Sequence, residues 1–97
     1  MHRDVRMVAE IRLTLYGLRV LSLFAKNETK WFSGSDVAKK TNLTNGTLYP
    51  LLFRLEGAGL LVSMWEDADP EILKRPRKRL YKITRTGINR LLFEQSK

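Results

Sequence analysis

Four polar or aromatic side chains stand close together where one helix of the chain is predicted to begin. An asparagine amide matches the hydrogen-bonding edge of adenine, and a threonine methyl group can touch thymine. A tyrosine hydroxyl and the backbone amides at a helix start can donate to phosphate oxygens. The four side chains therefore predict contacts with duplex nucleic acid, and they are Thr44, Asn45, Thr47 and Tyr49. In the competing interpretation, the first two only cap the helix and the tyrosine lies at the edge of the core.

A basic run follows later in the chain and suits the same partner. Between Lys74 and Arg90 the chain has eight basic residues and no acidic one. Pro76 interrupts the run and an alternating strand pattern follows it, so the run cannot form the amphipathic helix that binds membrane surfaces. We expect it to contact phosphates, with a merely solvated loop as the alternative. The residues concerned are Lys74, Arg75, Arg77, Lys78 and Arg79. Arg54 in the preceding helix is a further candidate for a phosphate contact, and pairing with Glu56 or Asp36 is the alternative for it.

Composition narrows the class of protein. The chain has 97 residues, a net charge of +8 and a pI near 10.2, which favour one domain, 1–97, and a polyanionic partner. Cysteine is absent and His2 is the single histidine, so disulfides and histidine-based metal or catalytic clusters are excluded. We expect no enzyme, no catalytic residue, no metal and no cofactor. No signal peptide or membrane-spanning run stands out, and we expect a cytoplasmic protein without membrane contact.

Hydrophobic periodicity predicts the elements that position these side chains. A helix over 8–26 is followed by a helix-turn-helix over 35–58, with Thr44 as the cap of its second helix. Two strands with a long loop between them form a wing over 60–84, with Leu80 and Ile83 facing inward. A last helix covers 84–95. The predicted fold class is α+β, mostly helical: a winged helix-turn-helix with a two-stranded β wing and flanking N- and C-terminal dimerisation helices.

The helix over 8–26 has apolar residues on two opposite faces. One face is needed for the protein's own core, and so short a chain has little left to cover the other. We therefore expect a homodimer, with a helix wrapped on both sides by its own domain as the alternative. The predicted interface consists of Val8, Ile11, Leu15 and Leu18, with Leu92 of the last helix.

The segment Gly46-Thr47-Leu48-Tyr49-Pro50-Leu51-Leu52, followed by Arg54-Leu55-Glu56 and Gly59-Leu60-Leu61, resembles the recognition-helix signature of the PadR transcriptional regulators. Pro76-Arg77-Lys78 and Ile83-Thr84-Arg85-Thr86-Gly87 are similar to that family's wing and the entry to its next helix. The resemblance implies a dimeric winged-helix repressor that binds an inverted repeat. It also implies that the first and last helices build the dimer, and that Thr47, Tyr49 and the basic wing touch DNA.

Taken together, these patterns predict a sequence-specific, DNA-binding transcriptional regulator, a repressor that acts as a homodimer. Two alternatives stay open: a nonspecific architectural DNA-binding protein, and a winged-helix module whose basic face meets an acidic protein. A small aromatic effector, bound in a pocket between protomers near Trp31 or Trp65, is a further hypothesis.

Overall fold

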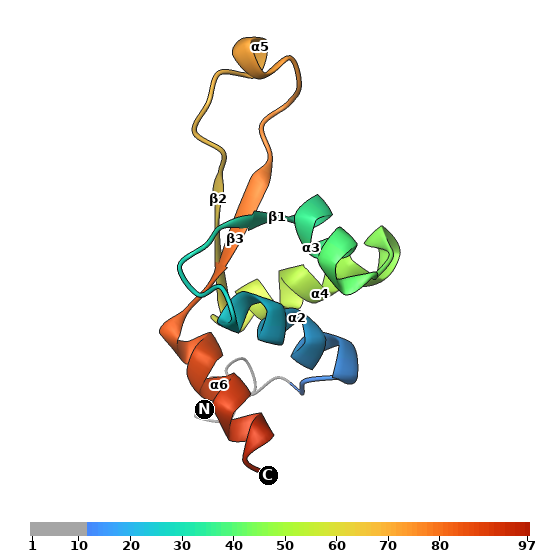
Figure 1. Ribbon diagram of the computed structural model, residues 1–97, viewed down its shortest axis with the longest axis vertical. Helices are drawn as coiled ribbons and strands as arrows, with labels where there is room; N and C mark the ends of the chain where they lie inside the picture. Colours follow the sequence, from blue (N-terminus) through green and yellow to red (C-terminus); the bar gives the residue numbers. More distant parts are fainter. Residues whose placement is uncertain (1–11) are drawn as a thin grey trace, which may run out of the picture.

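The protein is a helical body from which a β hairpin projects as a long wing (Figure 1). A computed structural model describes residues 12–97. Within that range no helix is long and apolar enough to cross a membrane. The elements follow in the order α2 (Leu15–Ala25), β1 (Phe32–Ser33), α3 (Gly34–Thr41), α4 (Asn45–Gly57), β2 (Leu61–Trp65), α5 (Pro70–Leu73), β3 (Arg79–Ile83) and α6 (Arg85–Gln95).

Helix α2 begins later than its periodicity predicts. Thr14 is extended, with φ −82° and ψ 172°, and its hydroxyl accepts the N–H of Gly17 at 3.0 Å. A threonine hydroxyl that satisfies a free amide favours a helix start over a helix interior. Within the described residues the expected helix over 8–26 therefore begins only at Leu15, and its first predicted residues, Val8 and Ile11 among them, lie outside the described part of the chain.

The face of α2 that packs into the core carries Val20, Leu21 and Phe24, all fully buried. Phe24 meets the ring of Phe32 edge-on, with 5.6 Å between the ring centres. On the other face Leu15 is 83% exposed, whereas Leu18 packs partly against the core. The two predicted interface residues of α2 thus differ in how much surface they offer.

Helices α3 and α4 form the predicted helix-turn-helix. Ser33 caps α3 reciprocally with Asp36: the serine hydroxyl accepts the Asp36 N–H at 3.2 Å, and the carboxylate accepts the Ser33 N–H at 3.1 Å. Asn42 ends α3 in the left-handed conformation, and Thr44 caps α4 as predicted. Helix α4 continues through Pro50 without a break. Its buried stripe is made of Leu48, Leu51, Leu52 and Leu55.

The sheet has three antiparallel strands in the order β1-β3-β2. The predicted two-stranded wing is present as β2 and β3, and the short β1 adds a third strand, with Phe32 opposite Tyr81. Tyr81 and Ile83 share the face that packs on the helices. The expectation that Leu80 also faces inward is wrong, because residues three apart on a strand point to opposite sides.

Helix α6 starts at a tight corner against the turn between α4 and β2. The Thr84 hydroxyl accepts the Gly87 N–H at 2.9 Å and lies 2.6 Å from the Gly59 carbonyl oxygen. Gly87 is buried there, and a methyl group in its place would overlap the Leu60 carbonyl oxygen. Leu91 of the same helix is buried, whereas Leu92 is 58% exposed.

Candidate nucleic-acid interface

The start of α4 presents the predicted polar side chains to solvent. Thr44, Asn45, Thr47 and Tyr49 are all exposed. Thr44 is the cap, because its hydroxyl accepts the Thr47 N–H at 3.3 Å. The same hydroxyl lies 3.2 Å from that of Thr47. Capping therefore occupies Thr44, whereas no hydrogen bond within residues 12–97 engages the Asn45 side chain.

Tyr49 leans from α4 across the beginning of α3. A methyl group on Gly34 would lie 2.5 Å from the Tyr49 hydroxyl and 2.6 Å from its ring carbon Cε1. Glycine at 34 is therefore what lets the ring lie close against α3. Tyr49 remains 44% exposed, so it is neither a core residue nor a free side chain. Sequence reasoning misses Gly34, because its partner is fifteen residues away and no local pattern links the two.

The wing is held together by Glu66. Its carboxylate accepts two hydrogen bonds from the Arg75 guanidinium, at 2.8 and 3.1 Å, and one from the Lys78 N–H at 3.3 Å. The Glu66 N–H donates in turn to the Lys78 carbonyl at 2.8 Å. The hydrogen bonds from Arg75 and then from the Lys78 backbone lower the pKa of Glu66, and the same carboxylate raises the pKa of Arg75. Most of the positive charge of Arg75 is thus compensated within the wing.

Two more arginines of the basic run are engaged inside the protein. Arg77 donates from Nε to the Ala68 carbonyl at 2.7 Å. Arg79 donates to the Ser63 hydroxyl at 3.0 Å, and its guanidinium carbon lies 4.9 Å from the centre of the Trp65 ring. Glu56, at the end of α4, lies 3.9 Å from the same guanidinium. Arg79 therefore links α4 to the wing, a role that the run of basic residues in the sequence does not reveal.

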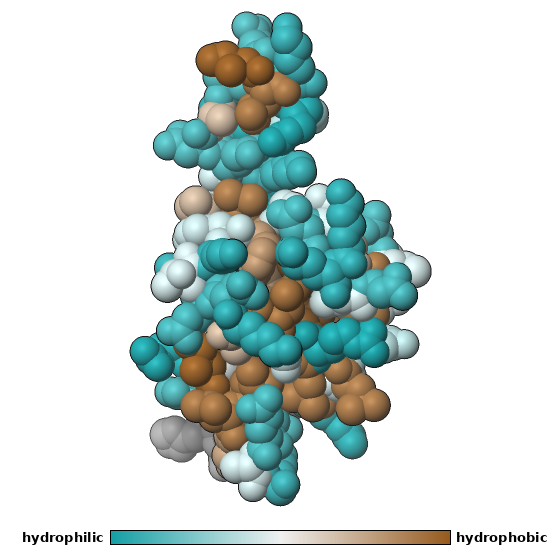
Figure 2. Space-filling model, viewed as in Figure 1, coloured by the Kyte–Doolittle hydropathy of each residue, from teal (hydrophilic) through white to brown (hydrophobic). Residues whose placement is uncertain are grey.

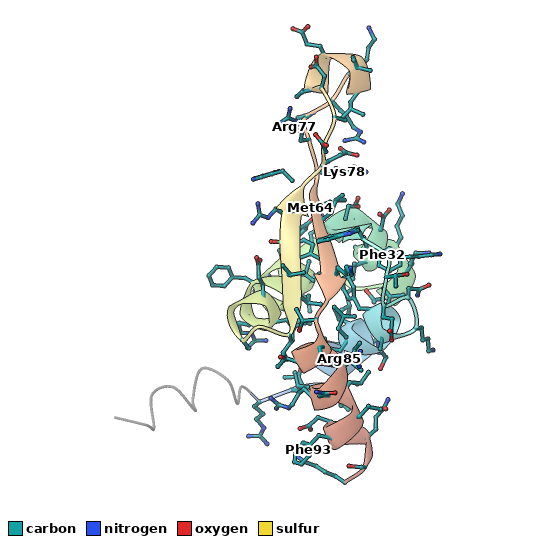
Figure 3. All side chains as sticks on the ribbon, turned by 90° about the vertical axis from the view of Figure 1, so that its left-hand side faces the viewer. Phe32, Met64, Arg77, Lys78, Arg85 and Phe93 are labelled. Atoms are coloured by element: carbon teal, nitrogen blue, oxygen red, sulfur yellow. The ribbon has the colours of Figure 1, made fainter. Side chains whose placement is uncertain are left out.

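Lys74 and Lys78 differ from these arginines. No hydrogen bond or ion pair within 4 Å engages either side chain among residues 12–97. Lys74 ends α5 in the left-handed conformation at the wing tip. Lys78 lies where the wing leaves the body, near Tyr49 and the start of α3 (Figure 3). Arg54 is exposed on α4. The cations left to meet an external partner are thus fewer than the basic run predicts.

The wing tip has a different character from the wing base. Its acidic residues stand in the loop before and within α5, at Asp67, Asp69 and Glu71. Hydrophobic residues gather there again after a hydrophilic middle section (Figure 2), and Ile72 is 79% exposed. Acidic groups repel phosphates, so the base of the wing suits DNA better than its tip.

The two tryptophans are not brought together. Trp31 is half-buried beneath Lys82, whose Nζ lies 5.5 Å from the ring centre. Trp65 is 59% exposed and lines a hollow of about 580 Å³ in the wing with Pro70 and Pro76. In residues 12–97 no group of three or more His, Cys, Asp or Glu could hold a metal ion.

Solved structures share this architecture. Staphylococcus aureus MepR, in its complex with DNA, is 18% identical with a TM-score of 0.71, over 98% of this chain and 69% of that chain. A PadR-like transcription factor from Bacteroides fragilis is 23% identical with a TM-score of 0.72, over 99% of this chain and 87% of that one. A PadR family regulator from Clostridium difficile is 23% identical with a TM-score of 0.69, over 86% of this chain and 85% of that one. These likenesses confirm the winged-helix fold.

The sequence pattern of the transcriptional regulator PadR-like family matches residues 35–92. No curated protein matches the chain. The matched range runs from the start of α3 through the recognition helix and the wing into α6, and so includes every element of the candidate interface. The chain belongs to the PadR-like family, whose members are transcriptional regulators and not enzymes.

Proposed function

We propose that this regulator binds duplex DNA with sequence preference through α4 and the base of the wing. The observation that carries the proposal is the exposed start of α4, where no hydrogen bond within residues 12–97 engages the Asn45 side chain and where Tyr49 of the same helix lines a hollow with Lys78 of the wing. Such a helix start enters the major groove in helix-turn-helix proteins, while flanking cations contact phosphates. The similar fold of MepR, which was solved in complex with DNA, supports the same use of the fold.

The base-reading and phosphate-contacting roles fall to different residues. We assign Asn45 and Thr47 to base edges, because amide and methyl groups discriminate between base pairs. Thr44 acts through its cap, and Tyr49 through its hydroxyl. Phosphate contacts fall to Arg54 and, at the base of the wing, to Lys78; Lys74 stands at the acidic wing tip and contributes less. Arg75, Arg77 and Arg79 contribute to the field of the wing, although their contacts within the protein limit what each can offer to DNA.

We further propose a homodimer. Leu15 is 83% exposed, and Leu92 and Phe93 of α6 are 58% and 59% exposed. Between α2 and α6 lies a hollow of about 440 Å³, lined in part by Ile88, Leu91 and Leu92. Apolar surface of this kind on neighbouring helices is typical of a subunit interface. Val8 and Ile11, the other predicted interface residues, lie outside the described part of the chain.

A dimer places two recognition helices about one DNA turn, roughly 34 Å, apart, so the operator is an inverted repeat. Bound there, the protein represses transcription by occupying the site. An aromatic effector that regulates it would bind in a pocket between protomers near Trp31 or Trp65, and of the two Trp65 lines a hollow of the wing. If no compound in a panel of planar aromatic molecules changes the fluorescence of Trp65, the hypothesis of an aromatic effector is refuted.

The test of base reading is a panel of duplexes that differ by single base pairs. In wild type, the preferred base pair at one position per half-site gains about 1–3 kcal/mol over the others, and Asn45→Ala loses that discrimination. Arg54→Ala is the control and weakens every duplex equally. A uniform loss with Asn45→Ala instead would reduce the residue to a phosphate or capping role. Wild type that binds all duplexes alike would favour the architectural alternative, and no DNA binding would favour the protein-interaction module.

The dimer is tested by sedimentation of Leu92→Asp. A buried, unpaired charge is costly, so the variant should sediment as a monomer while the wild type sediments as a dimer. Ile72→Asp, at the wing tip, where the side chain is also exposed, is the matched control and should leave the dimer intact. A wild type that is monomeric at micromolar concentration, or a Leu92→Asp variant that still dimerises, contradicts the proposed interface.

A further inference from the structure

A small hollow lies where three separate stretches of the chain meet. It measures about 260 Å³ and is lined by Ser33, Gly34 and Ser35 at the start of α3, by Tyr49 of α4, and by Lys78 and Arg79 at the base of the wing. It is distinct from the exposed first turn of α4, which carries the proposed base-reading residues. The proposed DNA contacts of α4 and of the wing thus flank it on both sides.

The shape of the hollow depends on Gly34. A methyl group there would lie 2.5–2.7 Å from the hydroxyl and two ring carbons of Tyr49. Contacts of that length do not occur, so any larger residue would push the tyrosine out of its place. With glycine, the ring packs against α3 and its hydroxyl stands at the hollow. No hydrogen bond within residues 12–97 uses that hydroxyl, which leaves it able to donate to a bound group.

The charges around the hollow favour an anion. Lys78 and Arg79 enter from the wing, and Arg79 is already held by Ser63 and Trp65. Lys78 has no ion pair within 4 Å among residues 12–97; Asp36 and Glu66 act on it from a greater distance, and Glu66 is already paired with Arg75. Burial opposes the ionisation of Asp36, but hydrogen bonds from Ser33 and the charges of Lys78 and Lys39 outweigh it, so the pKa of Asp36 is lowered. With their partners counted, four cations, Lys39, Arg75, Lys78 and Arg79, stand against three carboxylates, Asp36, Glu56 and Glu66, so the sum is positive.

The size of the hollow suits a compact oxyanion. Its volume of about 260 Å³ is several times the share of liquid volume of one water molecule, about 30 Å³. A phosphodiester group displaces only part of that volume, and its oxygens accept from ammonium groups and hydroxyls. We propose that this hollow is a phosphate socket that takes one backbone phosphate of each DNA half-site. Lys78, the Tyr49 hydroxyl and Ser35 bind that phosphate, and it sets the register of α4 on the duplex. This inference rests on the proposed function.

The test pairs protein variants with single neutral phosphates. Each phosphate of a bound duplex is replaced in turn by methylphosphonate, and binding is measured for wild type and Lys78→Gln. At one position per half-site, neutralising the phosphate should weaken wild type roughly tenfold and leave Lys78→Gln nearly unaffected, because both changes remove the same interaction. Lys78→Gln should also reduce the slope of log K against log salt by about 0.9 for each phosphate that the variant no longer neutralises. Lys39→Gln, on α3 but outside the hollow, is the matched control. Its effect on the binding free energy should add to that of the methylphosphonate at every position.

Two variants test the shape of the socket. Tyr49→Phe removes one hydroxyl and should weaken binding severalfold without changing the salt slope. Gly34→Ala should reproduce the weaker binding seen with Tyr49→Phe and abolish the single-position effect, with melting temperatures compared to exclude unfolding. If the effect of Lys78→Gln on the binding free energy adds to that of the methylphosphonate at every position, the phosphate socket is refuted, but the proposal that the protein binds DNA is not. A wild type that binds no duplex refutes the proposed function, and the socket with it.

Inorganic phosphate separates the two sources of this chemistry. The amide resonances of Gly34 and Ser35 are followed during titration with phosphate and, separately, with duplex. Shifts with duplex that millimolar phosphate does not reproduce support a DNA phosphate. Saturable shifts with free phosphate, abolished in Lys78→Gln and accompanied by additive methylphosphonate effects, overturn the proposal in favour of a free-anion site.

Discussion

Replacing Gly87 by alanine should destabilise the protein although alanine is the better helix former. The new methyl group would overlap the Leu60 carbonyl oxygen and lie 2.8 Å from Ile83 Cγ1, about 1 Å closer than two carbons ordinarily pack. Overpacking of this kind costs about 1–3 kcal/mol. The upper end applies here, because the carbonyl belongs to a backbone turn that Thr84 fixes with hydrogen bonds. The higher helix propensity of alanine offsets about 1 kcal/mol of this loss.

The expected net loss is therefore about 2 kcal/mol, which lowers the melting temperature of a domain of this size by roughly 8–16 °C. Thermal unfolding followed by circular dichroism measures it. Gly57→Ala is the matched control: it lies in α4, and its new methyl group would meet nothing within 4 Å. That variant should gain about 0.5–1 kcal/mol. Gly87→Ala with a wild-type or higher melting temperature would refute the close packing of α6 against the turn after α4.

Two further predictions concern the same corner and the wing. Thr84→Ala removes the cap of α6 and should cost about 1–2 kcal/mol, whereas Thr84→Ser keeps the hydroxyl and most of the stability; equal melting temperatures for both variants would contradict the assigned role of the hydroxyl. Arg75 lowers the pKa of Glu66, so the stabilisation from their pairing is fully present above the ordinary value of 4.5 and is lost as the pH falls through the lowered pKa. In a Trp31→Phe background, the fluorescence of Trp65 should therefore change only below about pH 4.5. Glu66→Gln should abolish that change. A fluorescence change that persists in Glu66→Gln would refute the role of Glu66 in holding the wing together.

Much of the fold follows from short-range patterns. Thr44 is readable as a cap because a hydroxyl residue precedes an apolar period, and the leucine stripe of α4 fixes which face is buried. The start of α2 is not readable in the same way. Thr14 lies inside an apolar periodic stretch, and only the structure shows that its hydroxyl caps Gly17. Hydrophobic periodicity indicates which face of a helix is buried, but it does not indicate at which residue the helix begins.

In the candidate site, too, the sequence predicts the local features but not the contacts between residues far apart in the chain. Which residues stand at the start of α4 is clear from the sequence, because capping and exposure there are local. Which cations are free is not, because that depends on partners far along the chain. Glu66 binds Arg75 across the wing, and Arg77 bonds the Ala68 carbonyl. A run of basic residues predicts a positive electrostatic field. The contacts that compensate part of this charge form only in the folded hairpin, and the sequence does not show them.

Selection of bound duplexes from a random DNA pool, at an ionic strength of about 150 mM, tests the central claim most directly. The account predicts enrichment of an inverted repeat whose half-sites lie about one helical turn apart, with Asn45→Ala relaxing one position in each half. Retention of DNA without enrichment of any sequence, or retention of none, would contradict it.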